Sequence, residues 1–128
     1  MPARTFSDGA EAMIPTLHGI ANCDTVKKAR AWLDERGAAY RFHDFRKLGV
    51  PEGELRRWIA AVGWERLVNR QGTTWRRLDE ATRAGVVDAV SAAVLMQAQP
   101  SLIRRPVLTV GDEVVVGFDV ARYAALFG

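Results

Sequence analysis

Cysteine is nearly absent from this chain, because Cys23 is the only one in 128 residues. A single cysteine excludes an intramolecular disulfide, and with it the small folds that depend on disulfides for stability. It also excludes a Cys-x-x-Cys pair, since Val26 stands three positions after Cys23. This usage is typical of a reducing compartment, so we expect a cytoplasmic protein in which any redox chemistry uses one thiol.

Long apolar runs and long basic runs are also missing. No stretch is long enough to span a bilayer, and Met1 to Glu11 lacks the apolar core of a signal peptide, so we expect no membrane association. The formal net charge is +3, but no run of Lys and Arg exceeds two residues, and we therefore predict no nucleic-acid partner. The mild positive charge suits a small anionic ligand.

The length of 128 residues is enough for one domain with a buried core. Residues 1–12 are mostly small and polar. We predict a disordered N-terminal tail over residues 1–12 and a single domain over residues 13–128. Met13 is an alternative start of the natural protein.

The first half of the domain has the pattern of a β-α-β unit. Residues 15–20 are typical of a strand, Ala21-Asn22 of a turn, and residues 24–36 of a helix with an apolar stripe that Gly37 ends. Residues 39–45 alternate as a second strand would. Two strands joined by one helix imply a right-handed parallel crossover.

The middle is predicted to be helical and the end to be a hairpin followed by a helix. We expect a helix that opens at Pro51 and ends at Gly63, a helical turn over residues 64–68 and a polar loop over residues 69–74. A further helix should run from an N-cap at Thr82 to Gln97. Its apolar stripe, predicted to lie in the core, consists of Val86, Val87, Val90 and Val94. A hairpin over residues 107–116 and a helix capped by Asp119 complete an α/β order of β-α-β, helical insertion and β-β-α.

Cys23 stands at the junction between the first strand and the first helix. A thiolate there faces backbone N–H groups and the positive end of the helix dipole, and both favour the charged nucleophile. Thr25 offers a hydroxyl and Lys27 lies one turn away, whereas the carboxylate of Asp24 opposes the thiolate. The alternative is an inert buried cysteine, but the position favours a reactive one.

Two further clusters contain candidate anion-binding residues. Arg104-Arg105-Pro106 precedes the hairpin, where Arg105 can present its fork to an anion and Pro106 is a candidate cis-proline. Gly72-Thr73-Thr74-Trp75-Arg76 offers a glycine that permits close approach, two hydroxyls and a cation. Taken alone, the arginine pair is better explained as a solvated surface pair, whereas a plain surface loop explains the second segment as well as a ligand site does. His18, Cys23 and His43 lack the spacing of metal ligands, and we expect each histidine to bond to the backbone.

Three segments in register resemble the arsenate-reductase-like (ArsC/Spx) family. They are residues 17–29 (Leu17-His18-Gly19-Ile20-Ala21-Asn22-Cys23 and onward), 72–76 and 104–106, and the likeness runs from about Ile14 to Phe127. The pattern is most similar to the YffB-type subgroup, which is regarded as glutathione-dependent thiol reductases. The resemblance implies a thioredoxin-like fold with a helical insertion, Cys23 as the nucleophile and Pro106 as the cis-proline beside it.

The chain departs from the arsenate reductases of this family at their three arginines. Arg105 matches one, but Gln71 occupies the second position, with Arg70 one residue earlier. The third is missing, because the last strand reads Val116-Gly117-Phe118. Each lost charge-assisted bond would weaken oxyanion binding by roughly 1.5–3 kcal/mol.

The sequence therefore predicts a glutathione-dependent thiol–disulfide oxidoreductase with no bound cofactor and glutathione as co-substrate. Its partners would be glutathione and a disulfide or oxidised thiol, held by Cys23 and by an anion site that comprises Asn22, Thr25, Lys27, Arg76, Arg105 and Pro106. One alternative is an arsenate reductase with an altered anion site. The other is a non-catalytic Spx-like regulator that binds a protein such as RNA polymerase through its helical insertion, without the Cys-x-x-Cys switch.

Overall fold

A computed structural model describes residues 14–127 of the chain. The predicted tail over residues 1–12 and the proposed start at Met13 lie outside the described residues. The strands are β1 (Thr16–Gly19), β2 (Arg41–Asp44), β3 (Val107–Val110) and β4 (Glu113–Val116). The helices flanking this sheet are α2 (Asp24–Glu35), α3 (Phe45–Leu48) and α9 (Val120–Phe127). The segment between α3 and β3 holds α4 (Glu52–Val62), α5 (Trp64–Leu67), α6 (Thr73–Arg77), α7 (Glu80–Ala84), α8 (Ala89–Ala98) and the 3₁₀ turn η1 (Pro100–Leu102).

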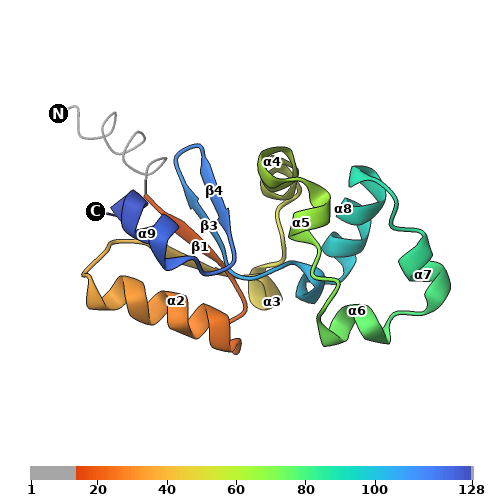
Figure 1. Cartoon of the computed structure of the whole chain (residues 1–128), viewed down its shortest axis with the longest axis horizontal. Helices are drawn as coiled ribbons and strands as arrows, with labels where there is room; N and C mark the ends of the chain where they lie inside the picture. The colour runs from red at the N-terminus through yellow and green to blue at the C-terminus, as the bar shows by residue number, and fades with distance from the viewer. Residues whose placement is uncertain (1–13, 128) are drawn as a thin grey trace.

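The four strands form one mixed sheet in the order β2-β1-β3-β4. β1 and β2 are parallel, as the crossover through α2 requires, whereas β1–β3 and β3–β4 are antiparallel. Gly111, with φ of 57°, makes the hairpin turn between β3 and β4. The predicted α/β order is confirmed, with the fold of a thioredoxin-like protein that carries a helical insert. Figure 1 shows the sheet, α2 and α9 on one side of the molecule and the insert, residues 49–106, on the other.

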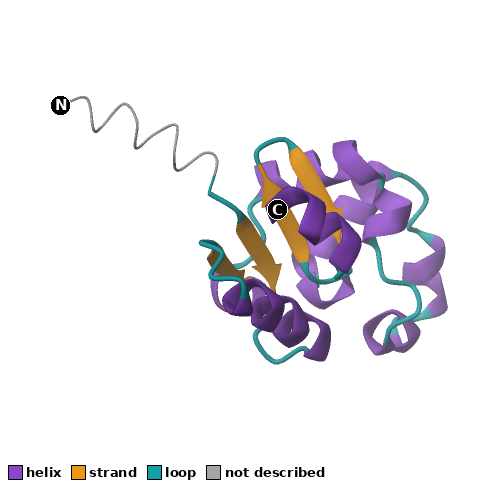
Figure 2. Ribbon diagram, turned by 60° about the vertical axis from the view of Figure 1, so that its left-hand side comes forward, coloured by secondary structure: helices purple, strands orange, loops and turns teal. Residues whose placement is uncertain are grey.

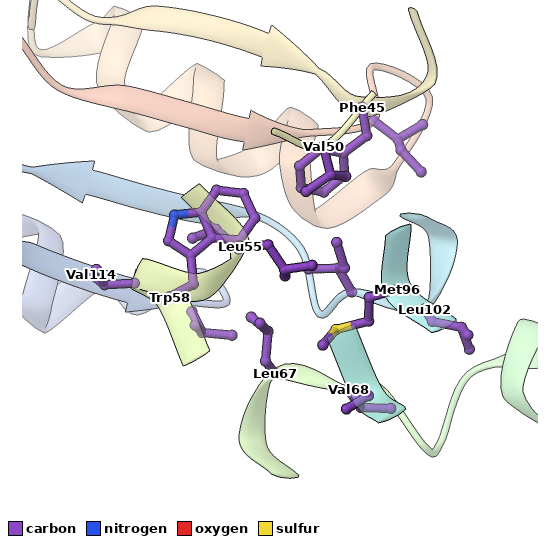
Figure 3. Close-up of a cluster of buried hydrophobic side chains, with 14 residues drawn as sticks. Phe45, Val50, Leu55, Trp58, Leu67, Val68, Met96, Leu102 and Val114 are labelled. Carbon is purple, nitrogen blue, oxygen red and sulfur yellow. The ribbon is translucent and has the colours of Figure 1, made fainter. Parts of the chain in front are cut away.

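Successive residues of each strand point to opposite sides of the sheet, so its apolar residues lie on both faces. Helices cover both faces. α2 and α9 cover one face (Figure 2), where the apolar stripe predicted for α2 is buried. We call this the outer cluster; its buried members are Leu17, Ala29, Leu33, Leu108, Val115 and Tyr123. The insert covers the other face and forms a larger insert cluster (Figure 3). Its largest buried side chains are Trp58, Phe45, Leu55, Leu67, Met96, Leu102 and Ile103.

Most predicted termini of the helices in the two β units are confirmed by cap geometry. α2 ends before Gly37, whose φ of 65° suits a residue without a side chain. Asp119 caps α9, because its Oδ1 accepts a hydrogen bond from the Arg122 backbone N–H at 3.1 Å. The predicted second strand was too long: it ends at Asp44, whose carboxylate accepts from the Arg46 N–H at 2.9 Å and starts α3 at Phe45.

The single helix predicted from Thr82 to Gln97 is wrong. Asp79 rather than Thr82 caps α7, and its carboxylate accepts from the Thr82 N–H at 2.7 Å. α7 ends at Gly85, since glycine is costly inside a helix, and Asp88 caps a new helix, α8, by a capping box with Ser91. Thr73 and Thr74, predicted as loop, belong to α6.

The prediction that the valine stripe of this segment lies in the core is wrong for three of its four members, whereas Val86 is half-buried and packs against the insert cluster. Val87, Val90 and Val94 are 70%, 73% and 66% exposed. α8 instead buries Ala92 and Met96 against the insert cluster. A helix with apolar residues on all sides gives no periodic signal to indicate which side faces the core.

Candidate functional site

The end of β1 is shaped so that α2 can begin close above the sheet. Gly19 is the last residue of β1, and a Cβ atom on it would lie 2.8 Å from the Cγ2 atom of Val26. Val26 is fully buried in the first turns of α2, so its methyl group has no room to move away. Glycine at this position therefore lets the N-terminus of α2 pack tightly against the strand end that leads to Cys23.

Cys23 is the N-cap residue of α2, as the sequence indicated. Its backbone is extended, with φ of −136° and ψ of 125°, and its carbonyl accepts the first helical hydrogen bond from the Lys27 N–H at 2.9 Å. Its side chain makes no capping hydrogen bond. The thiol is free, half-buried and packed against the insert cluster. Cys23 thus combines partial access with an end of a helix that favours negative charge.

The loop that contains Arg105 and Pro106 opens at the same end of the sheet as Cys23. β1 and β3 are antiparallel with His18 opposite Val107, so on this register the next pair is Gly19 and Pro106. The Arg105–Pro106 peptide bond is cis, as the resemblance implied. Topology therefore brings the Cys23 turn and the cis-proline loop to one edge, although 83 positions separate Cys23 and Pro106 in the sequence.

Arg105 is held in place by the end of the insert. Its Nη1 donates to the Ser101 carbonyl in η1 at 3.0 Å. Its Nε is buried and has no hydrogen-bond partner among residues 14–127. A buried guanidinium N–H without a partner is costly, and an anion that accepts from it would remove that cost. Ser101 was not singled out in the sequence, since a backbone carbonyl leaves no signal in residue type.

The other predicted site residues fall into two groups. Asn22, Thr25 and Lys27 surround Cys23 in the turn and the first helical turn, and all three are exposed. Arg76 is exposed on α6, which packs against η1, so Arg76 and Arg105 both lie around that short turn. Within the described residues, no hydrogen bond or ion pair joins the Cys23 side chain to Lys27, Arg76 or Arg105.

Gly72 does not leave space for a ligand in the way its sequence context suggested. A Cβ atom at Gly72 would lie 2.8 Å from the Nδ2 atom of Asn69. The close approach that this glycine permits is therefore to a side chain of the insert itself. Arg70, one residue before the second arginine position of the family, lies with its guanidinium carbon 5.8 Å from the centre of the Trp64 ring.

Both histidines bond to backbone carbonyls, as predicted. His18 Nδ1 lies 3.0 Å from the Val107 oxygen, and His43 Nε2 lies 2.8 Å from the Gly49 oxygen. No cluster of three or more potential metal-ligating side chains occurs within residues 14–127. His18 instead packs its ring against Trp58, with ring centres 4.8 Å apart, and so helps to join the sheet to the insert.

Burial lowers the pKa of His18 to about 4, helped by the positive charges of His43 and Arg57 and opposed by the hydrogen bond to Val107. The unfolded chain titrates near pH 6.5, so it binds more protons than the folded chain between pH 6.5 and pH 4. The neutral ring's contribution is complete above pH 6.5 and is lost as pH falls towards 4. We expect a loss of about 3 kcal/mol in unfolding free energy over that range.

Urea unfolding at a series of pH values measures this loss. A His18→Asn variant, which keeps a donor for the Val107 carbonyl, should show a flatter dependence on pH than the native chain. If the unfolding free energy of the two proteins depended equally on pH, His18 would not be the group that causes the loss.

The model of the ArsC family matches residues 18–126, which include Cys23 and the Arg105–Pro106 loop. The chain belongs to the ArsC family. The solved structure of a YffB protein (PA3664) is 51% identical, with a TM-score of 0.85 over 89% of this chain and 99% of that one.

Two curated relatives extend the comparison. An uncharacterized protein of Haemophilus influenzae is 38% identical over 112 residues, which are 88% of this chain and 97% of the relative. The global transcriptional regulator Spx of Streptococcus mutans is 24% identical over 107 residues, 81% of this chain and 76% of the regulator. No helix among residues 14–127 has the length and apolar character needed to cross a membrane.

Proposed function

We propose that this ArsC-family member is a glutathione-dependent thiol–disulfide oxidoreductase of the cytoplasm, with Cys23 as its nucleophile. The observation that carries the proposal is the position of Cys23, a half-buried free thiol at the N-cap of α2. The cis-proline loop with Arg105 begins at the same edge of the sheet. Both loops leave the sheet at one end, and this supports a site in which a nucleophile and a cation act on the same anionic thiol substrate.

The absence of a second cysteine defines the reaction as a one-thiol cycle. The Cys23 thiolate attacks the glutathione sulfur of a mixed disulfide, R–S–S–G. This forms a Cys23–glutathione disulfide and releases the R–S⁻ thiolate, which takes up a proton. A second glutathione thiolate then attacks the sulfur of that bound glutathione, releasing oxidised glutathione and restoring the Cys23 thiolate. The substrate is reduced by two electrons, and two glutathione molecules end as one disulfide.

Arg105 is the best-placed residue to bind a carboxylate of glutathione. The Ser101 carbonyl fixes one side of its guanidinium, and its buried Nε is left without a partner among the described residues. A charge-assisted hydrogen bond at such a group contributes about 1.5–3 kcal/mol. The exposed side chains of Asn22, Thr25, Lys27 and Arg76 are proposed to hold the remaining polar groups of the ligand, and Pro106 to line the site.

A turnover assay tests this function. We expect the protein to catalyse reduction of a mixed disulfide between glutathione and a small thiol, with glutathione oxidation followed through a coupled glutathione reductase. An Arg105→Lys variant keeps the charge but loses the Nε donor, so its KM for glutathione should rise about tenfold with kcat nearly unchanged. No turnover above the uncatalysed rate, in a protein shown to be folded, would contradict the proposal.

Two further assays separate the alternatives. Reduction of arsenate with glutathione would indicate an arsenate reductase, for which Arg105 is the one matched arginine in this chain. Binding of RNA polymerase by a protein without turnover would indicate a regulator, as the likeness to Spx suggests. If the protein is a regulator of this kind, replacement of Cys23 is expected to leave its binding of RNA polymerase unchanged.

A further inference from the structure

The insert has an apolar surface that nothing in residues 14–127 covers. α8 contains no charged residue, and its two faces are both apolar. One face is buried at Ala92 and Met96, whereas Val90 and Val94 on the other are 73% and 66% exposed. A helix that is apolar all round is normally buried all round, and a concentrated exposed patch marks an interaction surface.

This surface is a groove between α4 and α8, which contact each other. The groove has a volume of about 610 Å³. Its apolar lining includes Leu55, Ile59 and Ala60 from α4 and Val90, Ala93 and Val94 from α8. Residues on both helices recur at steps of three and four, so each helix presents a continuous strip to the groove.

The groove and the ridge beside it have the shapes needed to fit each other. Val90 and Val94 stand four residues apart and form a protruding row on α8. The groove is also lined by Ala60 of α4 and Ala93 of α8, whose small side chains leave a furrow between the helices. Rows of side chains pack into furrows of this kind at helix–helix contacts. The same surface therefore carries the ridge and the furrow that a helix–helix contact requires.

The charges at the rim indicate what binds there. Among the described residues that line the groove, Glu52 and Arg56 are the charged ones, and they form an ion pair within α4. A rim with one charge of each sign offers no preference to an acidic or a basic partner. A two-fold axis, however, brings a surface onto its own copy, so a neutral rim with both signs is complementary to itself.

We infer that the groove between α4 and α8 is the contact surface of a symmetric homodimer. The Val90–Val94 row of one copy lies in the furrow of the other. Glu52 of each copy then faces Arg56 of the other copy. This contact replaces or adds to the Glu52–Arg56 ion pair within each chain. The groove includes none of the candidate site residues around Cys23, so the inference does not depend on the proposed function.

Sedimentation of the full chain over a wide range of concentrations tests the dimer. We expect a species of twice the 14.2 kDa chain mass that dissociates on dilution. Val90→Glu should give a monomer, because it sets two carboxylates into the apolar contact. The matched control is Val120→Glu on α9, where the valine is 50% exposed and outside the groove, and it should remain dimeric. Circular dichroism checks that both variants are folded.

A charge exchange tests the two-fold geometry. Glu52→Arg and Arg56→Glu should each weaken the dimer, because each gives a rim of one sign. An equimolar mixture of the two variants should restore a dimer, since every pair across the axis is then opposite in charge. A chain that stays monomeric at every concentration, or a dimer that Val90→Glu and Val120→Glu leave equally intact, would overturn the inference.

Discussion

Replacement of Cys23 by serine is expected to abolish glutathione-dependent turnover while leaving the fold intact. Serine has nearly the same volume, but its hydroxyl neither ionises at neutral pH nor forms a disulfide, so the first step of the cycle is lost. Cys23 is half-buried and its thiol makes no capping hydrogen bond, so the free energy of unfolding should change little. Activity should fall to the uncatalysed rate.

A nearby substitution is the matched control for this loss. Ala21→Ser adds the same hydroxyl at an exposed position in the turn before Cys23, and its turnover should equal that of the native chain. Urea unfolding of both variants verifies that stability is preserved. Residual turnover in the Cys23→Ser protein would show that another group carries the reaction.

Trp58→Ala is expected to cause the largest loss of stability of any variant considered. Trp58 is fully buried between the sheet and the helices of the insert (Figure 3). Its ring contacts His18 on β1, and its centre lies 5.9 Å from that of Phe45. Truncation removes these contacts and leaves a large cavity, which costs about 3–5 kcal/mol. Urea unfolding should show a lower midpoint with an unchanged slope.

Trp58→Phe separates packing from the polar group of the indole. Trp58 Nε1 has no hydrogen-bond partner among residues 14–127, so phenylalanine removes an unpaired buried donor while it keeps an aromatic ring. The loss of stability should therefore be much smaller than for alanine. A cost below about 1 kcal/mol for Trp58→Ala, as at a surface position, would contradict the role of this residue.

The β units were predictable because their signals are local. A strand, a turn and a helix follow one another around Cys23, and the glycine after α2 and the aspartate before α9 mark helix ends. Such signals act within a few residues and do not depend on the rest of the fold. The cysteine's position at the start of a helix followed directly from them.

The insert was harder to predict because its decisive interactions are not local. Four valines at helical spacing predicted one buried stripe, yet three of them are exposed. The predicted helix is broken between α7 and α8, which leaves Val87 outside both, and both sides of α8 are apolar, so the pattern could not show that Val90 and Val94 face outward. The sequence likewise gives no sign that Ser101 holds Arg105, or that α6 packs on η1 and so brings Arg76 near the same turn. Backbone carbonyls and helix–helix contacts have no signature in a single sequence.

The most direct test of the central claim is mass spectrometry of the native protein after treatment with oxidised glutathione. We expect one glutathione adduct per chain, located on the peptide that contains Cys23, and its release on addition of reduced glutathione. The unfolded chain is the reference, because its thiol has no structural activation, and the native protein should react faster. A native thiol that reacts no faster than the unfolded one, or forms no adduct, would contradict Cys23 as the nucleophile.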